Sequence, residues 1–456
     1  MKPARTSSIS RKAIVVFAFA GTIACADDAP TAVPSVNPTH LSAASTAASN
    51  DYMVINLGVL STDLAHPALS TAYDINASGT VVGQSTDNDF RTLAFIWKRE
   101  TGMSALDRSC PTPSSSRANA INDAGWVVGQ SMGRAALWKP GECAHFLFPE
   151  YVRSMAWDVN NDGIIVGQYQ SGASDVMDRA FRWANGKIVD LEYVDGAETT
   201  AYAINNSGMI VGSERIPGGS VDDAVFWNPA GARTRLGIDK TLGYLGHARS
   251  VNDRGEIAGQ YNPFDLPLST SAFVWRPGQS PMRVASRAAA FGINNNGQMV
   301  GLDRSISFDA TPVLWDPMAG TVALPRLGGL RGTAYAINDA GWIVGFSEQQ
   351  TDGLSRAVLW RRNAAPVARI DGPATGMKKK PLVFSAASST DPDGDALSFS
   401  WSFGDNTPAT AGTAVTHEYD DWGSFTITLT ARDAYGLSSS VAYAVTIAPP
   451  GQVKRR

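Results

Sequence analysis

Short alternations of apolar and polar residues, each ended by a turn, run along most of the chain and predict β-strands. Within one stretch we predict strands over 201–205, 209–213, 224–227 and 234–237, separated by turns rich in Asn, Gly and Pro. No window of the sequence shows sustained helical periodicity or helix caps. The pattern therefore predicts an all-β protein, which must close or shield its strand edges.

One order of residues recurs seven times in this β-rich region. Each repeat has an aromatic or small residue, an apolar residue, Asn, two polar or small residues, Gly, three mostly apolar residues and a second Gly, as in residues 73–83. The Asn positions lie about 44 residues apart, a period that suits four short strands with their turns. The repeated Asn residues are Asn76, Asn122, Asn160, Asn205, Asn252, Asn294 and Asn338. Each repeat closes on a Trp, and these are Trp97, Trp138, Trp183, Trp227, Trp275, Trp315 and Trp360.

The repeated Asn and Trp side chains each allow two interpretations. Asn caps its own turn through its side chain, which we favour, or seven Asn residues form a polar ring that binds sugars or water-mediated ligands. One Trp per repeat in the same register predicts packing between neighbouring repeats, with glycan stacking as the alternative. Trp126 and Trp342 follow the turn Gly in only two repeats and are candidates for exposed aromatic residues.

Four strands per repeat predict a seven-bladed β-propeller over residues 51–364. The seventh repeat lacks a fourth strand after Trp360. The segment before the first repeat, 53–60, matches residues 324–330, which precede the seventh Asn turn. We therefore predict that 53–60 supplies the outer strand of the seventh blade and closes the ring.

The repeats resemble the HAF repeat family of extracellular bacterial proteins over about residues 52–361. The family is named for a His-Ala-Phe signature before the Trp, which here reads Leu-Ala-Phe at 93–95, Arg-Ala-Phe at 179–181 and Ser-Ala-Phe at 271–273. The His is thus replaced throughout. The resemblance implies an extracellular location and a propeller-like fold, but no general activity.

A different unit is predicted over residues 365–449, followed by a tail over residues 450–456. The landmarks of the unit are Phe384, Trp401, the Gly404-Asp405 pair and Tyr419. Residues 426–430 alternate between apolar and polar, as a half-buried strand should. This order resembles a PKD domain, an immunoglobulin-like β-sandwich. The resemblance implies a spacer or a protein- or glycan-binding accessory. Asn replaces the usual Gly after Gly404-Asp405, and Asn tolerates the left-handed backbone of such a turn.

Three carboxylates alternate around Gly394 at Asp391, Asp393 and Asp395. Closely spaced anions repel one another, and a hard cation with oxygen ligands relieves that repulsion. We therefore predict a structural Ca²⁺ here, with a solvated acidic turn as the alternative. The EF-hand pattern is not met, because position 402 is Ser. No other cofactor is required by the sequence.

The N-terminal sequence predicts a targeting segment. Residues 1–24 combine basic residues with an apolar run over 13–24, which is typical of a secretory signal peptide and too short to span a membrane. The Thr-Ile-Ala-Cys sequence ending at Cys25 resembles a bacterial lipobox, which implies lipidation of Cys25. Ordinary cleavage nearby is the alternative, because Thr22 stands where Leu is usual. Residues 25–50 form a flexible tether rich in Ala, Ser, Thr and Pro.

The cysteine count fits an exported protein. Without Cys25, only Cys110 and Cys143 are left. In an oxidising compartment this pair predicts one disulfide, and two separate buried thiols are the alternative.

Charge and motifs exclude several classes of function. Lys and Arg total 38 and Asp and Glu total 42, so the net charge is −4 and no basic stripe favours nucleic acid or an anionic membrane surface. The five His residues are scattered, which argues against zinc. Residues 129–133 match G-x-S-x-G, but Ser131 ends a predicted strand, without the following helix of a nucleophile elbow.

We therefore predict an exported envelope protein that binds or scaffolds a glycan or protein partner and is not an enzyme. Its membrane contact is the lipid anchor alone. One alternative is a polysaccharide lyase or hydrolase on a propeller scaffold, which needs convergent acidic or Arg/Tyr/His residues at one mouth of the ring. Another is a purely structural surface component.

Overall fold

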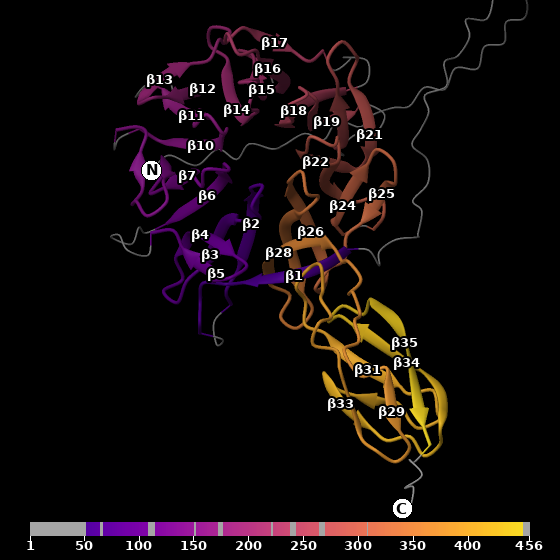
Figure 1. Cartoon of the computed structure of the whole chain (residues 1–456). Helices are drawn as coiled ribbons and strands as arrows, with labels where there is room; N and C mark the ends of the chain where they lie inside the picture. The colour runs from indigo at the N-terminus through magenta and orange to yellow at the C-terminus, as the bar shows by residue number, and fades with distance from the viewer. Residues whose placement is uncertain are drawn as a thin grey trace, which may run out of the picture. The chain divides into compact units, whose positions relative to one another are not determined.

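The computed structural model describes residues 52–63, 67–107, 115–149, 152–171, 177–219, 222–237, 243–263, 270–307 and 309–449. These residues form 35 β-strands and contain no helix (Figure 1). The fold class of this part of the chain is therefore all-β. No helix long and apolar enough to cross a membrane occurs within these ranges.

The repeats form seven four-stranded antiparallel sheets, numbered here 1 to 7 in the order of their first strands. The first strands are β2 (Ser70–Ile75), β6 (Ser116–Ile121), β10 (Ser154–Val159), β14 (Glu198–Ile204), β18 (Gly243–Val251), β22 (Ala288–Ile293) and β26 (Gly328–Ile337). The second strands are β3 (Val81–Thr86), β7 (Val127–Ser131), β11 (Ile165–Ser171), β15 (Ile210–Arg215), β19 (Ile257–Pro263), β23 (Met299–Asp303) and β27 (Ile343–Gln349). The third strands are β4 (Thr92–Lys98), β8 (Arg134–Trp138), β12 (Met177–Ala184), β16 (Asp222–Trp227), β20 (Ser271–Trp275), β24 (Thr311–Asp316) and β28 (Ser355–Arg362).

The fourth strand follows the third in six sheets and comes from the N-terminal segment in sheet 7. The six are β5 (Gly102–Ala105), β9 (His145–Phe146), β13 (Lys187–Asp190), β17 (Arg233–Arg235), β21 (Met282–Ser286) and β25 (Gly320–Ala323). In sheet 7 the edge strand is β1 (Tyr52–Gly58), which pairs antiparallel with β28 and sets Val54 opposite Trp360 (Figure 1). Chain segments some 300 residues apart thus share one sheet.

Neighbouring sheets contact one another in chain order, and sheet 7 contacts sheet 1. Each first strand meets the first strand of the next sheet, and β26 meets β2. Each sheet is itself open, with two edges. The last sheet nevertheless contacts the first, so that every sheet has a neighbouring sheet on both sides.

The two Gly residues of each repeat serve different steric needs, as sheet 1 illustrates. Gly79 ends the Asn turn with φ at +82°, a backbone conformation that side chains disfavour. Gly83 pairs with Ala72 across β2 and β3, and a Cβ at this position would collide with the backbone oxygen of Thr71. The first two strands therefore approach so closely only because the second Gly of the motif has no side chain.

Seven hydrophobic cores fill the spaces between consecutive sheets, including the space between sheets 7 and 1. Each of these cores contains one of the seven repeated tryptophans. Five of the indoles are buried, and Trp97 and Trp275 are half-buried. Burying a large aromatic side chain contributes roughly 2–3 kcal/mol, so the indoles supply a large share of the adhesion between sheets.

The C-terminal unit is a β-sandwich of a five-stranded and a two-stranded sheet. Its strands are β29 (Thr375–Met377), β30 (Leu382–Ser385), β31 (Ser398–Ser402), β32 (Thr410–Ala411), β33 (Ala414–His417), β34 (Gly423–Arg432) and β35 (Ser438–Ala448). Phe384, Trp401 and Tyr419 are fully buried in its core. Asn406 has φ at +64°, so the prediction of a left-handed turn at this Asn is confirmed.

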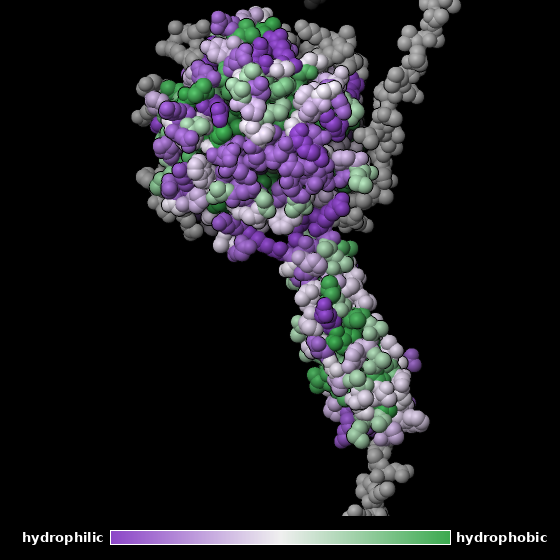
Figure 2. All heavy atoms as spheres, turned by 45° about the horizontal axis from the view of Figure 1, so that its top comes forward, coloured by the Kyte–Doolittle hydropathy of each residue, from purple (hydrophilic) through white to green (hydrophobic). Residues whose placement is uncertain are grey.

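Polar residues gather on the visible face of the seven sheets. Figure 2 shows a broad hydrophilic area there and a more mixed surface over the C-terminal domain. A polar face of this kind suits hydrogen-bonding ligands better than an apolar partner.

Candidate functional site

A β-bulge interrupts the first strand of every repeat sheet at the same place. In β2 the pairing with β3 shifts between Ala72 and Asp74, which leaves Tyr73 unpaired, and the other six first strands shift at the equivalent position. The Ala before each bulge is completely buried in all seven sheets. Bulges redirect a side chain and are frequent beside functional sites.

The seven bulged residues differ in chemistry although their backbone positions are equivalent. They are Tyr73, Asn119, Trp157, Tyr202, Arg249, Phe291 and Tyr335. Asn119 is buried and donates its Nδ2 hydrogen to the backbone oxygen of Ala156 at 2.8 Å. The other six are half-buried, so their side chains are within reach of a ligand.

The bulged aromatic residues contact one another from sheet to sheet. Tyr335 lies 5.3 Å from Phe291 and 5.4 Å from Tyr73, and Trp157 lies 5.7 Å from Tyr202, measured between ring centroids. We call these five residues the aromatic belt. Its members come from five different sheets, so only the assembled fold brings them together.

Two arginines stack on this belt. The Arg117 guanidinium lies 4.0 Å from the Tyr73 ring centroid and 5.7 Å from that of Trp157, and the Arg249 guanidinium lies 4.3 Å from that of Tyr202. Such cation–π contacts contribute about 0.5–2 kcal/mol each. Arg117 thereby connects two members of the belt that do not contact each other directly.

A polar cavity of about 300 Å³ opens beside the Trp157–Tyr202 pair. Gln168 accepts the indole hydrogen of Trp157 at 3.1 Å and donates to Asp178 at 2.9 Å. The wall combines two aromatic rings with carboxylate, amide, hydroxyl and guanidinium groups, and its residues are Trp157, Gln168, Asp178, Glu198, Thr200, Tyr202, Ser213, Arg215, Asp222 and Arg249. A few convergent polar groups beside aromatic rings are characteristic of small-ligand sites.

Charges in this cavity are largely paired. Arg215 contacts Glu198 at 3.0 Å and Asp222 at 2.7 Å. Burial, with the nearby charge of Glu198, raises the pKa of Asp178. Outside the lining, His247 lies 3.5 Å from Asp222, and burial with the charge of Arg249 lowers the pKa of His247 to about 4, so this imidazole is neutral at pH 7. The site therefore favours a ligand with hydroxyl groups over a strongly charged one.

Two carboxyl groups follow the bulges of sheets 1 and 3. Burial, together with the charge of Asp158, raises the pKa of Asp74 to about 8. Burial raises the pKa of Asp158 to about 6. Each carboxylate accepts a backbone hydrogen from the next sheet at 2.8 Å, Asp74 from Ile121 and Asp158 from Ile204. These two carboxyl groups, which the repeat pattern did not single out, each stand one residue after a member of the aromatic belt.

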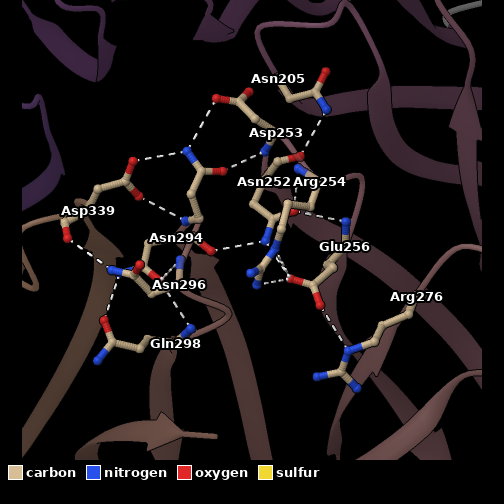
Figure 3. A network of polar contacts seen from close by, with 11 residues as sticks. Asn205, Asn252, Asp253, Arg254, Glu256, Arg276, Asn294, Asn296, Gln298 and Asp339 are labelled. Carbon is tan, nitrogen blue, oxygen red and sulfur yellow. Dashed lines mark hydrogen bonds and ion pairs between the residues drawn. The ribbon is translucent and has the colours of Figure 1, made fainter.

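The seven repeated Asn side chains form a second system, the asparagine belt, part of which Figure 3 shows. Each Oδ1 accepts the backbone hydrogen of the residue four positions on, which holds its own turn. Each Nδ2 donates to the backbone oxygen of the Asn in the next sheet, and Asn338 donates to Asn76 at 3.0 Å. All seven side chains are buried and bonded, so the belt connects sheets instead of presenting amides to a ligand.

An outer row of side chains repeats this connection one residue further on. Asn295 donates to Asp253 at 3.2 Å and to Asp339 at 2.9 Å. Side chains at the equivalent positions of sheets 2 to 7 accept backbone hydrogens from the preceding sheet, and they are Asp123, Asn161, Asn206, Asp253, Asn295 and Asp339. In sheet 1 the position is Ala77, which has no polar side chain, so the row is interrupted there.

Two motifs singled out in the sequence prove to be structural. Trp126 and Trp342 are half-buried, and each packs against the turn Gly of the next sheet, Gly163 and Gly79 respectively, so the expectation of exposed aromatics is wrong. Ser131 is 1% exposed and lies in a strand–turn–strand hairpin, which is not a nucleophile elbow.

The three carboxylates of the C-terminal domain do come together. Ligand atoms of Asp391, Asp393 and Asp395 all lie within 4.8 Å of one another. The buried Arg361 guanidinium contacts Asp393 at 2.5 Å and Asp395 at 3.2 Å. The Asp391 Oδ1 atom accepts the backbone hydrogen of Asp393 at 2.8 Å, whereas its Oδ2 atom is buried without a hydrogen bond. An arginine thus already neutralises part of this negative charge.

Cys143 is disulfide-bonded. The other two cysteines of the chain, Cys25 and Cys110, lie outside the described residues.

The repeat pattern does not reveal the aromatic belt, because the pattern is defined by the residues that all seven copies share and the bulged residues differ between copies. All seven bulged residues stand three positions before the repeated Asn. The signal was therefore a column of seven variable, mostly aromatic residues in an otherwise regular repeat. The direction of these side chains cannot be predicted from the sequence, because a bulge interrupts the regular alternation of side chains between the two faces of a strand.

Comparison with known families identifies the C-terminal domain. Residues 363–447 match the PKD domain family, and this part of the chain is a PKD domain. The chain is 35% identical over 89 residues to the microbial collagenase of Vibrio alginolyticus, a match that covers 20% of this chain and 11% of the collagenase. It is 35% identical over 85 residues to collagenase ColQ1 of Bacillus cereus, covering 19% of this chain and 9% of that protein. The chain thus spans about a tenth of the length of these relatives.

Solved structures add little to this identification. The PKD1 domain of the Vibrio cholerae metalloprotease PrtV is 29% identical over 18% of this chain and 98% of its own, with a TM-score of 0.17. The extracellular domain of a one-component system from B. thetaiotaomicron covers 88% of this chain and 58% of its own, at 8% identity and a TM-score of 0.43. Neither similarity carries an argument on fold or function.

Proposed function

We propose that this chain is an exported, non-catalytic envelope protein that binds a glycan in the cavity beside Trp157 and Tyr202. The observation that carries the proposal is the composition of that cavity, in which two half-buried rings adjoin amide, carboxylate and guanidinium groups. Sugars present C–H faces that pack on aromatic rings and hydroxyl groups that bond to such polar side chains. A protein partner on the same surfaces is the alternative binding function.

The seven sheets are, in this proposal, the blades of a β-propeller with HAF-type repeats. Sheet 7 contacts sheet 1, and Asn338 bonds to Asn76, which supports closure of the ring. A rigid ring then displays the aromatic belt, and the PKD domain acts as an accessory module. The signal peptide over 1–24, lipidation at Cys25 and a disulfide between Cys110 and Cys143 complete the proposal of an envelope location.

The test is calorimetric binding of envelope polysaccharides to residues 26–456 produced without lipid. Trp157→Ala and Tyr202→Ala should each weaken binding by about tenfold or more, because each removes one ring of the site. Trp422→Ala is the matched control, since Trp422 is 65% exposed on the PKD domain. Loss of binding in the control alone would move the site to the PKD domain. Self-association without any ligand would favour the purely structural alternative.

A polysaccharide-active enzyme is the second candidate, favoured by one observation. Asp74 and Asp158 each stand one residue after a bulged member of the aromatic belt, and burial raises the pKa of both carboxyl groups, which is the change that a general acid in glycosidic cleavage needs. Release of oligosaccharides that is abolished by Asp74→Asn and Asp158→Asn would establish this activity. Binding without any product would exclude it for the polysaccharides tested.

We also propose that Ca²⁺ stabilises the loop that carries Asp391, Asp393 and Asp395. The three carboxylates supply the oxygen ligands that Ca²⁺ prefers, and the Asp391 Oδ2 atom lacks a hydrogen bond. Because Arg361 neutralises part of the cluster, Ca²⁺ must bind beside this side chain or displace it. Thermal melts with Ca²⁺ and with chelator should differ in midpoint, and more so in Arg361→Gln. Identical midpoints in both proteins would favour the solvated acidic turn.

A further inference from the structure

In five of the seven repeats, the residue after the turn Gly lies against the turn of the next sheet. A Cβ placed on Gly163 would lie 2.7 Å from Cζ3 of Trp126, and one on Gly79 would collide with Trp342. Indoles from sheets 2 and 7 thus cover the turns of sheets 3 and 1. In sheets 3 to 6 the equivalent residues are Ile164, Met209, Glu256 and Gln298.

Sheets 1 and 3 depart from this arrangement, and the equivalent residue of sheet 1, Thr80, is the smallest of the seven. Around the turn of sheet 2, a Cβ on Gly125 would meet only Pro140, which belongs to sheet 2 itself. A cavity of about 690 Å³ lies between sheets 1 and 2, lined by Thr80 and Gly125 among others. The cavity therefore opens beside the smallest side chain found at this position of the repeat.

The walls of this cavity suit an apolar ring with a polar edge. Ile96, Ala105 and Leu106 are half-buried and supply apolar surface. Lys98, Ser104, Asp123, Lys139 and Glu142 add polar and charged groups at its edge. The volume falls within the range of about 300–1,000 Å³ that small-molecule sites occupy.

We infer that this cavity binds a small planar aromatic molecule about the size of an indole. The corresponding space between sheets 2 and 3 holds the indole of Trp126, and that between sheets 7 and 1 holds the indole of Trp342. A free aromatic ring entering between sheets 1 and 2 gains the packing that Thr80 does not supply. This site uses none of the residues of the proposed glycan cavity, so either proposal stands or fails without the other.

Calorimetric titration of residues 26–456 with indole tests the inference. The unmodified protein should bind one indole. Thr80→Trp places the missing ring and should abolish binding, with an unchanged or higher melting temperature. Thr80→Met, which copies Met209 of sheet 4, should weaken binding at least tenfold and serves if the Trp variant does not fold.

Trp342→Ala is the positive control, since it opens the equivalent space between sheets 7 and 1 and should bind a second indole. If the unmodified protein does not bind indole at millimolar concentration, the inference is overturned. The result is most direct if Trp342→Ala does bind one indole molecule under the same conditions. Binding unaffected by both Thr80 substitutions would overturn it as well, because the ligand would then lie elsewhere.

Discussion

At the scale of the single residue, Asp74 has a carboxyl group whose pKa is raised by burial to about 8. Its carboxyl group lies beside the aromatic belt, near the charge of Asp158, and its hydrogen bond to the backbone of Ile121 does not offset burial. In the unfolded chain such a carboxyl ionises near its ordinary pKa of 3.8, and in the folded chain near 8. Between these values the folded protein holds a proton that the unfolded chain has lost, so stability falls as pH rises.

Asp74→Asn removes this dependence and retains an oxygen for the Ile121 hydrogen. We expect the variant to melt at about the same temperature as the unmodified protein at pH 4 and clearly higher at pH 9. Asp158→Asn is the matched comparison, and its advantage should be complete near pH 6 to 7, because the pKa of Asp158 is about 6. Melting curves from pH 4 to 9 measure both effects. A difference that does not change with pH would contradict the raised pKa.

Ala77 marks a second residue at which one repeat differs from the others. The outer row of side chains is continuous from Asp123 to Asp339 but has no acceptor at Ala77. Its neighbours in the row are both Asp, as are the neighbours of Asn295, which donates to both of them. The position therefore resembles that of Asn295 in everything except its own side chain.

Ala77→Asn should complete the row and raise stability by about 0.5–1.5 kcal/mol, the usual net contribution of one hydrogen bond. Chemical denaturation measures the change. Ala124→Asn, at an exposed neighbouring turn position outside the row, is the control and should have little effect. Equal effects of the two substitutions would mean that the amide introduced at position 77 forms no bond to the neighbouring sheets.

At the scale of elements, the repeat encodes two kinds of contact in one short motif. The turn Asn bonds to its own turn and to the next sheet, and the second Gly permits the close approach of the first two strands. A bulge before the Asn leaves one residue of each first strand out of the pairing with the second strand. Six of the seven bulged residues are half-buried. The residue type at this position differs between sheets, whereas the strand around it is the same in all seven.

At the scale of the whole molecule, β1 joins the two ends of the repeat region. Tyr52, Met53 and Leu57 are each at most 6% exposed, and β1 pairs with β28 along six residues of its length. Burial of three such side chains contributes roughly 5 kcal/mol. Without β1, sheet 7 would have three strands and an uncovered edge.

Deletion of residues 51–60 should therefore lower the melting temperature of the whole repeat region in one cooperative step. Deletion of residues 26–49 is the control and should leave the midpoint unchanged, because it retains β1. Circular dichroism with thermal melting makes the comparison. An unchanged melt after loss of 51–60 would show that the repeat region does not depend on this strand.

The sequence by itself determined the local parts of this protein. Seven copies of an Asn-turn motif specify seven sheets because turn and strand preferences act over a few neighbouring residues, and the PKD domain is recognisable from its own landmarks. The tertiary structure decided the rest. It placed Asn338 against Asn76, 262 residues away, set Arg361 among the three aspartates, and left a cavity beside Thr80. Contacts of this kind depend on the direction of side chains after assembly, which no short-range pattern records.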